Sequence, residues 1–169
     1  MVWRWLQTLW QPHQRVGELA ALVSSTARRV EIEGRVEALT SLRNPVSGEP
    51  CVALEYRAWP PSTTLGMDGA TAHAGRAYQV NARQAVDFVL EEGGVRVLVH
   101  TDHGEDLAAL HRSLLERYGV SLRAECDALV VGQRLLVTGT VEHRRSSVGT
   151  PHRELPYSAI VRAERLRVV

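Results

Sequence analysis

The sequence contains no lysine, so all 20 of the basic side chains counted in its 169 residues are arginines. Lysine is the residue with which a P-loop reaches nucleotide phosphates, and the residue that forms a Schiff base with a carbonyl substrate. The sequence therefore excludes both of these chemistries.

Cysteine is scarce, with only Cys51 and Cys126 in the chain. Two thiols are too few for a four-thiolate zinc site or for the disulfide framework of a small secreted domain. No apolar run approaches the roughly 20 residues that span a bilayer. The first residues also lack the apolar core and the cleavage site of a signal peptide. We therefore expect a soluble, cytoplasmic protein in a reducing compartment.

An excess of one charge is lacking as well, because the net charge is +1 with 23% charged and 44% hydrophobic residues. A nearly neutral chain creates no overall field that attracts nucleic acid or an anionic membrane. Its length and composition are ordinary for one globular domain with its own core. We assign residues 14–169 to that single domain and residues 1–13 to an N-terminal arm.

The N-terminal arm holds three of the four tryptophans. Trp3, Leu6 and Trp10 fall close to one face of a helix, which predicts a short helical arm. One interpretation is that this arm packs over an open end of the domain's own core. The other is that these residues, together with Trp5, bind a partner protein or make peripheral contact with a membrane, where tryptophan is favoured.

Most of the domain shows the period of two that is typical of half-buried strands. In residues 30–39, apolar residues or glycine alternate with charged residues, and Gly34 in mid-strand indicates the tight curvature of a small barrel. Strict alternation near the C-terminus would put Ile160 and Leu166 on one face and Val161 on the other. Further strands are predicted at residues 51–59, 77–90, 95–100, 120–125, 135–142 and 157–169.

One main helix is expected after the strand at residues 95–100. Asp102 and Glu105 have the spacing of an N-cap residue and its N3 partner, and Gly119 supplies a C-terminal stop. A shorter helix is predicted within residues 15–27. The fold class that follows is mainly β, of the α+β type: a small curled sheet or OB-like barrel with one main helix and an N-terminal helical arm.

The densest turn signal lies at residues 44–50, between two predicted strands. Pro45 fixes its φ, Gly48 allows a positive φ, and the side chain of Asn44 can satisfy local backbone groups. A shaped turn between strands is where a small β domain usually presents a contact surface. Asn44, Pro45 and Gly48 are therefore candidate partner-binding residues.

Four short segments occur in a fixed order along the chain. They are residues 34–36 (GRV), 44–51 (NPVSGEPC), 88–95 (FVLEEGGV) and 131–134 (VGQR). In this order they resemble the GIDE/MULAN-type domain, which lies beside the membrane in a family of mitochondrial ubiquitin ligases and has bacterial relatives. The similarity runs from about Val16 to the C-terminus, with Asn44 in place of the family's first Ser and Gln133 in place of an Asp.

The resemblance implies a bacterial relative that binds or scaffolds other proteins, in a larger assembly or near a membrane. The ligases of the family carry membrane-spanning helices and a zinc-binding RING. Two cysteines cannot supply a RING, so ubiquitin-ligase activity is not part of what the resemblance implies. No cofactor is expected.

A first alternative function rests on Arg144, Arg145 and Arg153, which flank a polar loop. This local basic patch would contact an anion or a nucleic acid from a barrel loop. The low net charge argues against nucleic acid, and so does the small number of aromatic residues that could stack on bases. The ordinary interpretation is a solvated hairpin loop.

A second alternative is a metal-dependent enzyme, in which His100, Asp102 and His103 hold the metal at a strand-to-helix junction. The ordinary interpretation is that Asp102 caps the helix and both histidines are solvated. Cys51 could pair with a histidine as a nucleophile, but its place at the start of a strand favours a small buried residue. We therefore expect a non-enzymatic module that binds a protein partner.

Overall fold

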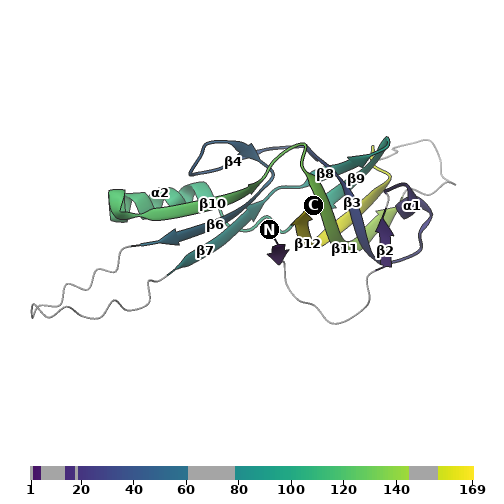
Figure 1. The fold of residues 1–169 in the computed structure, drawn as a ribbon, viewed down its shortest axis with the longest axis horizontal. Helices are drawn as coiled ribbons and strands as arrows, with labels where there is room; N and C mark the ends of the chain where they lie inside the picture. The colour runs from purple at the N-terminus through teal and green to yellow at the C-terminus, as the bar shows by residue number, and fades with distance from the viewer. Residues whose placement is uncertain (1, 5–13, 18, 61–78, 145–155) are drawn as a thin grey trace, which may run out of the picture.

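Five strands form a closed barrel in the computed structural model, which describes residues 2–4, 14–17, 19–60, 79–144 and 156–169. They are β3 (Arg29–Ala38), β8 (Phe88–Glu92), β9 (Val95–His100), β11 (Arg134–Arg144) and β12 (Ala159–Val168). Neighbours pair antiparallel, except that β9 and β12 run parallel and close the barrel (Figure 1). The order around the barrel is first, second, third, fifth and fourth, as in an OB fold, which confirms the predicted mainly β, OB-like architecture.

Short elements extend the barrel at its ends. β1 (Val2–Arg4) pairs antiparallel with β12, and β2 (Gln14–Gly17) pairs parallel with β3. α1 (Leu19–Ser24) is the short helix expected within residues 15–27, and its Leu19 and Leu22 are fully buried. At Val2–Arg4 the structure has a strand where the helical periodicity predicts the start of an arm. The remaining arm residues Trp5, Leu6 and Trp10 lie outside the described residues.

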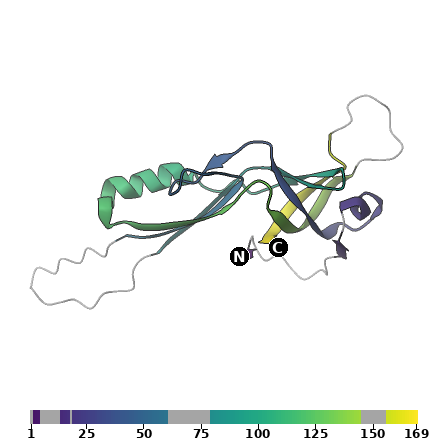
Figure 2. The ribbon, with the colours of Figure 1, turned by 45° about the horizontal axis from the view of Figure 1, so that its top comes forward.

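A second unit, called the lobe below, projects from one side of the barrel (Figures 1 and 2). It is an antiparallel sheet of β10 (Arg123–Leu129), β6 (Ala53–Trp59) and β7 (Val80–Ala85), with α2 (Leu107–Tyr118) against one face. A short helix, η1 (Gly119–Ser121), joins α2 to β10. Gly119 ends α2 as predicted, with a φ of 55°.

The lobe comes from two separate parts of the chain. One part leaves the barrel after β3 and returns at β8, and it contributes β6 and β7. The other leaves after β9 and returns at β11, and it contributes α2 and β10. On the first part, β4 (Leu42–Arg43) pairs with β5 (Pro50–Cys51) and closes the turn predicted at residues 44–50.

Two hydrophobic cores hold these units. The barrel core contains Phe88 and Val137 and continues into the base of the lobe through Val52 and Leu129. The lobe core lies between α2 and the sheet and contains the fully buried Tyr56. Because the first core crosses the junction, apolar packing fixes the lobe to the barrel.

The start of α2 differs from the prediction. Its N-cap is Asp106, whose carboxylate accepts two hydrogen bonds of 3.1 Å from backbone N–H groups of the first turn. Asp102 and Glu105 are therefore not the capping pair. The preceding segment is extended beside β7, where Gly104 forms a bridge with Gln84, and this pairing postpones the helix.

The strand predicted at residues 77–90 is also different, because it is two strands in two sheets. β7 belongs to the lobe and β8 to the barrel. The break falls at Val86 and Asp87, where the Val86 N–H donates to the carbonyl of Val52 at 2.9 Å. Local periodicity continues through this point, whereas the change of sheet depends on tertiary contacts.

A β-bulge reverses the alternation within β12. Thr138 pairs with Arg165 and Gly139 with Ala163, so the register between β11 and β12 skips Glu164. As a result, both Val161 and Leu166 point into the barrel core, although strict alternation puts them on opposite faces.

Within the described ranges, no helix is long and apolar enough to cross a bilayer.

Candidate functional site

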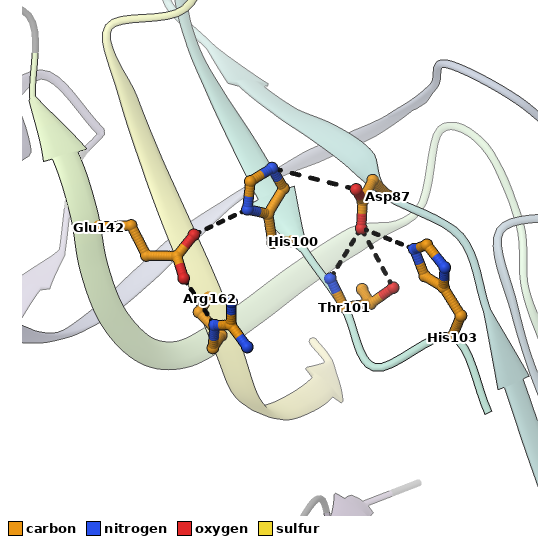
Figure 3. Close-up of polar contacts among 6 residues, drawn as sticks. All are labelled: Asp87, His100, Thr101, His103, Glu142 and Arg162. Carbon is orange, nitrogen blue, oxygen red and sulfur yellow. Dashed lines mark hydrogen bonds and ion pairs between the residues drawn. The ribbon is translucent and has the colours of Figure 1, made fainter.

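Six polar residues gather on the barrel where it meets the lobe (Figure 3). They are Asp87, His100, Thr101, His103, Glu142 and Arg162, and they are called the polar cluster below. The cluster contains the two histidines selected from the sequence, so its geometry decides what they can do.

Strand pairing brings the members of the cluster together. β9 and β12 run parallel with His100 opposite Arg162. Glu142 lies at a β-bulge of β11, between Val141 and His143, and the bulge turns its side chain toward this pair. Three strands therefore contribute one side chain each to a row across the outside of the barrel.

Glu142 bonds to both of the other side chains in the row. One carboxylate oxygen accepts from Nε of Arg162 at 2.6 Å, and the other lies 2.7 Å from Nδ1 of His100. The hydrogen bond from Arg162 holds the pKa of Glu142 below its ordinary value, with a smaller contribution from His100. The same pairing raises the pKa of the Arg162 guanidinium.

Asp87 connects the cluster to the lobe. Its Oδ1 accepts from the backbone N–H of Thr101 at 2.9 Å and lies 3.4 Å from Nε2 of His103. Its Oδ2 is 4.0 Å from Nε2 of His100. Asp87 lies where the chain passes from β7 of the lobe to β8 of the barrel, and Thr101 lies where it leaves β9 for α2. These contacts therefore join two of the segments that connect the barrel to the lobe.

The polar cluster contains metal-ligating residue types, but they are not arranged as a metal site. Among the described residues, no three His, Cys, Asp or Glu side chains are arranged to hold a metal ion, so the metal site hypothesised from His100, Asp102 and His103 has no support in the geometry. An imidazole between two carboxylates can relay a proton. The contacts of this cluster, however, join strands to one another, which is how cross-strand pairs stabilise a sheet.

The turn at residues 44–50 is held in place by Asn44, which is 4% exposed and is the only buried amide or charged side chain in the described part of the chain. Its Oδ1 accepts from the backbone N–H groups of Val46 and Ser47 at 2.9 and 3.2 Å. Its Nδ2 donates to the carbonyl of Cys126 on β10 at 3.5 Å. One side chain thus folds the turn and attaches it to the lobe sheet.

Backbone contacts complete the turn. The Gly48 N–H donates to the carbonyl of Asn44 at 2.8 Å, and the Asn44 N–H donates to the carbonyl of Glu49 at 2.9 Å. Gly48 has a φ of 77°, a value that glycine adopts without strain. Pro45 is half-buried, whereas Val46 at the tip is 47% exposed. The turn is therefore rigid at its base and accessible at its tip.

Arg144 serves the structure of the barrel. Its Nε donates to the carbonyl of Leu22 at 3.3 Å, and its Nη2 donates to the carbonyl of Ala27. Leu22 lies in the last turn of α1 and Ala27 follows the helix. Partial burial lowers the pKa of the Arg144 guanidinium. Arg145 and Arg153 lie outside the described residues. Of the three arginines in the predicted basic patch, the structure therefore describes the contacts of Arg144 alone.

Four ionisable side chains lie in the interior of the lobe or at its margin: Cys51, Tyr56, His111 and Cys126. The hydroxyl of Tyr56 lies 2.8 Å from Nδ1 of His111, with the two rings edge to face. Burial raises the pKa of Tyr56 and lowers that of His111. Burial also raises the pKa of Cys51 to about 11 and that of Cys126 to about 12. Thiols with such values are poor nucleophiles at neutral pH.

Sequence reasoning missed Glu142 and Arg162. Both residues lie in strands whose polar positions are expected to face solvent, and a bulge places Glu142 beside His100.

Comparisons with protein-family models, with curated proteins and with solved structures find no match to this chain.

Proposed function

We propose that this chain is a non-enzymatic module that binds a protein partner through the turn at residues 44–50. The single observation that supports it is the construction of this turn, in which Asn44 is buried and bonded at both ends of its amide while Val46 is exposed at the tip. A preorganised loop loses little conformational entropy when it binds, and this is how contact loops gain affinity.

The proposal agrees with what the resemblance to the GIDE/MULAN-type domain implies. It includes a cytoplasmic location in a larger assembly or beside a membrane. Trp3, Trp5, Leu6 and Trp10 remain a second proposed contact surface for the partner or for the membrane. The low nucleophilicity of the buried Cys51 and the partly buried Cys126 supports binding over covalent catalysis.

Site-specific photo-crosslinking tests the proposal. A benzophenone amino acid replaces Val46 in one variant and the exposed Val169 on the barrel in a matched control, and both are expressed in the native host. We expect a discrete crosslinked partner from position 46 and none from position 169. Asn44→Ala should reduce the yield, because the turn loses its internal hydrogen bonds. The same bands from both positions, or none from position 46, would reject the turn as a contact site.

A further inference from the structure

The two edge strands of the lobe sheet, β7 and β10, differ in how far other segments of the chain hydrogen-bond to them. On the β7 edge, the Ala85 N–H donates to the carbonyl of His103 at 3.0 Å, and the Glu105 N–H donates to the carbonyl of Arg83 at 2.9 Å. The segment before α2 therefore closes the part of this edge nearest the barrel. An edge strand that is covered in this way cannot pair with another chain.

Among the described residues, the β10 edge is closed at one point, where the carbonyl of Cys126 accepts from Asn44. In an antiparallel strand, the N–H and C=O of one residue point to the same side, and the side alternates along the strand. Since the carbonyl of Cys126 points away from β6, the N–H and C=O of Ala124 do so as well. Within the described ranges, no hydrogen bond is formed to these two groups of Ala124.

The side chains around this open stretch define what would fit beside it. On the face of the sheet away from α2, Arg123 and Glu125 keep 75% and 45% of their side-chain surface exposed. They pair with each other at 2.8 Å, and Arg123 also stacks on Trp59. On the α2 side, Ala124 is small and belongs to the edge of the lobe core.

We propose that the outer half of β10 receives an extended segment of the partner protein as a fourth strand of the lobe sheet. The main chain of that segment bonds to the N–H and C=O of Ala124. Its side chains alternate, with an acidic residue opposite Arg123, a basic residue opposite Glu125 and an apolar residue against Ala124. This inference rests on the proposed binding function and names the kind of segment that is bound.

Asn44 gives this site a defined end. The Nδ2 of Asn44 already donates to the carbonyl of Cys126, as the N–H of a neighbouring strand would, so the added strand stops at the turn. The charges on the edge also restrict the partner. A strand without matching charges breaks the pair between Arg123 and Glu125 without replacing it, which is how edge strands avoid indiscriminate pairing.

The test uses a phage-displayed library of random peptides panned against the purified full chain. Selected peptides are synthesised, and their affinities are measured by fluorescence anisotropy. We expect sequences that alternate apolar and charged residues. Ala124→Pro should weaken them at least about tenfold, since proline removes the outward N–H. Ala124→Ser keeps this N–H and is the matched control.

Amide hydrogen exchange of the wild-type chain adds a measurement that does not depend on how Ala124→Pro folds. The Ala124 amide should exchange quickly in the free protein and become protected when peptide is bound. The Glu125 amide, bonded to β6, should be protected in both states.

The outcomes separate this inference from the proposed function. Peptides that bind Ala124→Pro as well as wild type and leave the Ala124 amide unprotected would overturn strand addition and leave the turn as a contact site. A library that yields no binder would also overturn it. If peptides protect the Ala124 amide but position 46 captures no partner, strand addition stands and the turn is not a contact site.

Discussion

The hydroxyl of Tyr56 and Nδ1 of His111 lie 2.8 Å apart across the interior of the lobe. Tyr56 belongs to the central strand of the lobe sheet and is fully buried, so its hydroxyl needs a partner inside the protein. His111 supplies that partner from α2. The helix is therefore held to the sheet by a directional contact as well as by apolar packing.

We expect acid to weaken the lobe through His111. Burial lowers the pKa of His111 in the folded state from an ordinary value of 6.5. Below that value the unfolded state binds more protons, so stability is complete above about pH 6.5 and is lost as the pH falls toward the lowered pKa. His111→Gln should flatten this dependence in urea unfolding followed by circular dichroism. The exposed His103→Gln should retain it, and the same slope in both variants would contradict the assignment.

A second acid transition should belong to Glu142. Its pKa lies below the ordinary value of 4.5, chiefly because Arg162 donates a hydrogen bond to it. The stability that it contributes is present above that value and is lost as the pH falls through the lowered pKa. Glu142→Gln should remove this part of the acid profile, whereas Glu116→Gln on the exposed side of α2 should not. The measurement is the urea midpoint between neutral pH and about pH 3.

Gly139 should not tolerate a side chain. A Cβ at this position would overlap the carbonyl oxygen of Arg162 on β12, which is backbone and cannot swing away. We expect Gly139→Ala to lower the free energy of unfolding by about 1–3 kcal/mol or more. Gly94→Ala is the control, because a Cβ there meets nothing and costs only the strain of its positive φ. Thermal melts that rank the two variants in the opposite order would show that the barrel can relax at Gly139.

Both thiols should resist alkylation in the folded protein. With a pKa of about 11 for Cys51 and about 12 for Cys126, the thiolate fraction at pH 8 is about one in a thousand or lower. Burial of Cys51 slows the reaction further. Mass spectrometry after iodoacetamide treatment should show an unmodified native chain and two modifications in urea. Rapid labelling of the native chain would mean that the lobe core opens often.

Arg144 should matter for stability and not for binding nucleic acid. Arg144→Gln removes donors from the carbonyls of Leu22 and Ala27, and we expect a loss of about 1–3 kcal/mol. The exposed Arg112→Gln should change stability little. Fluorescence anisotropy with labelled oligonucleotides at low salt should show no binding by the wild type. Binding that Arg144→Gln abolishes without unfolding would restore the alternative function.

The barrel could be predicted from the sequence because its signals are local. In β3 the alternation puts Val30, Ile32 and Val36 on one face, and all three are buried. The packing of Gly34, where a Cβ would press on Leu19 and Leu90, also follows from its place in mid-strand. These features depend on side-chain period and backbone freedom, which one sequence contains.

The start of α2 and the polar cluster depend on register and could not be predicted. Asp102 and Asp106 both suit an N-cap, and the choice is made by the bridge between Gly104 and Gln84 on another strand. The approach of His100 to Glu142 requires the closure of the barrel by β9 and β12 and a bulge in β11. Neither the pairing of distant strands nor the position of a bulge is encoded in a short sequence pattern.

The origin of the lobe in two separate parts of the chain has a consequence for engineering. A single deletion that removes the whole lobe also removes β8 and β9 of the barrel, and a single fragment that contains the lobe contains them too. These two barrel strands lie in the chain between β6 and β10, which pair in the lobe sheet. This sheet can form only after distant parts of the chain have met, which is a slow kind of folding step. We therefore expect barrel and lobe to fold together.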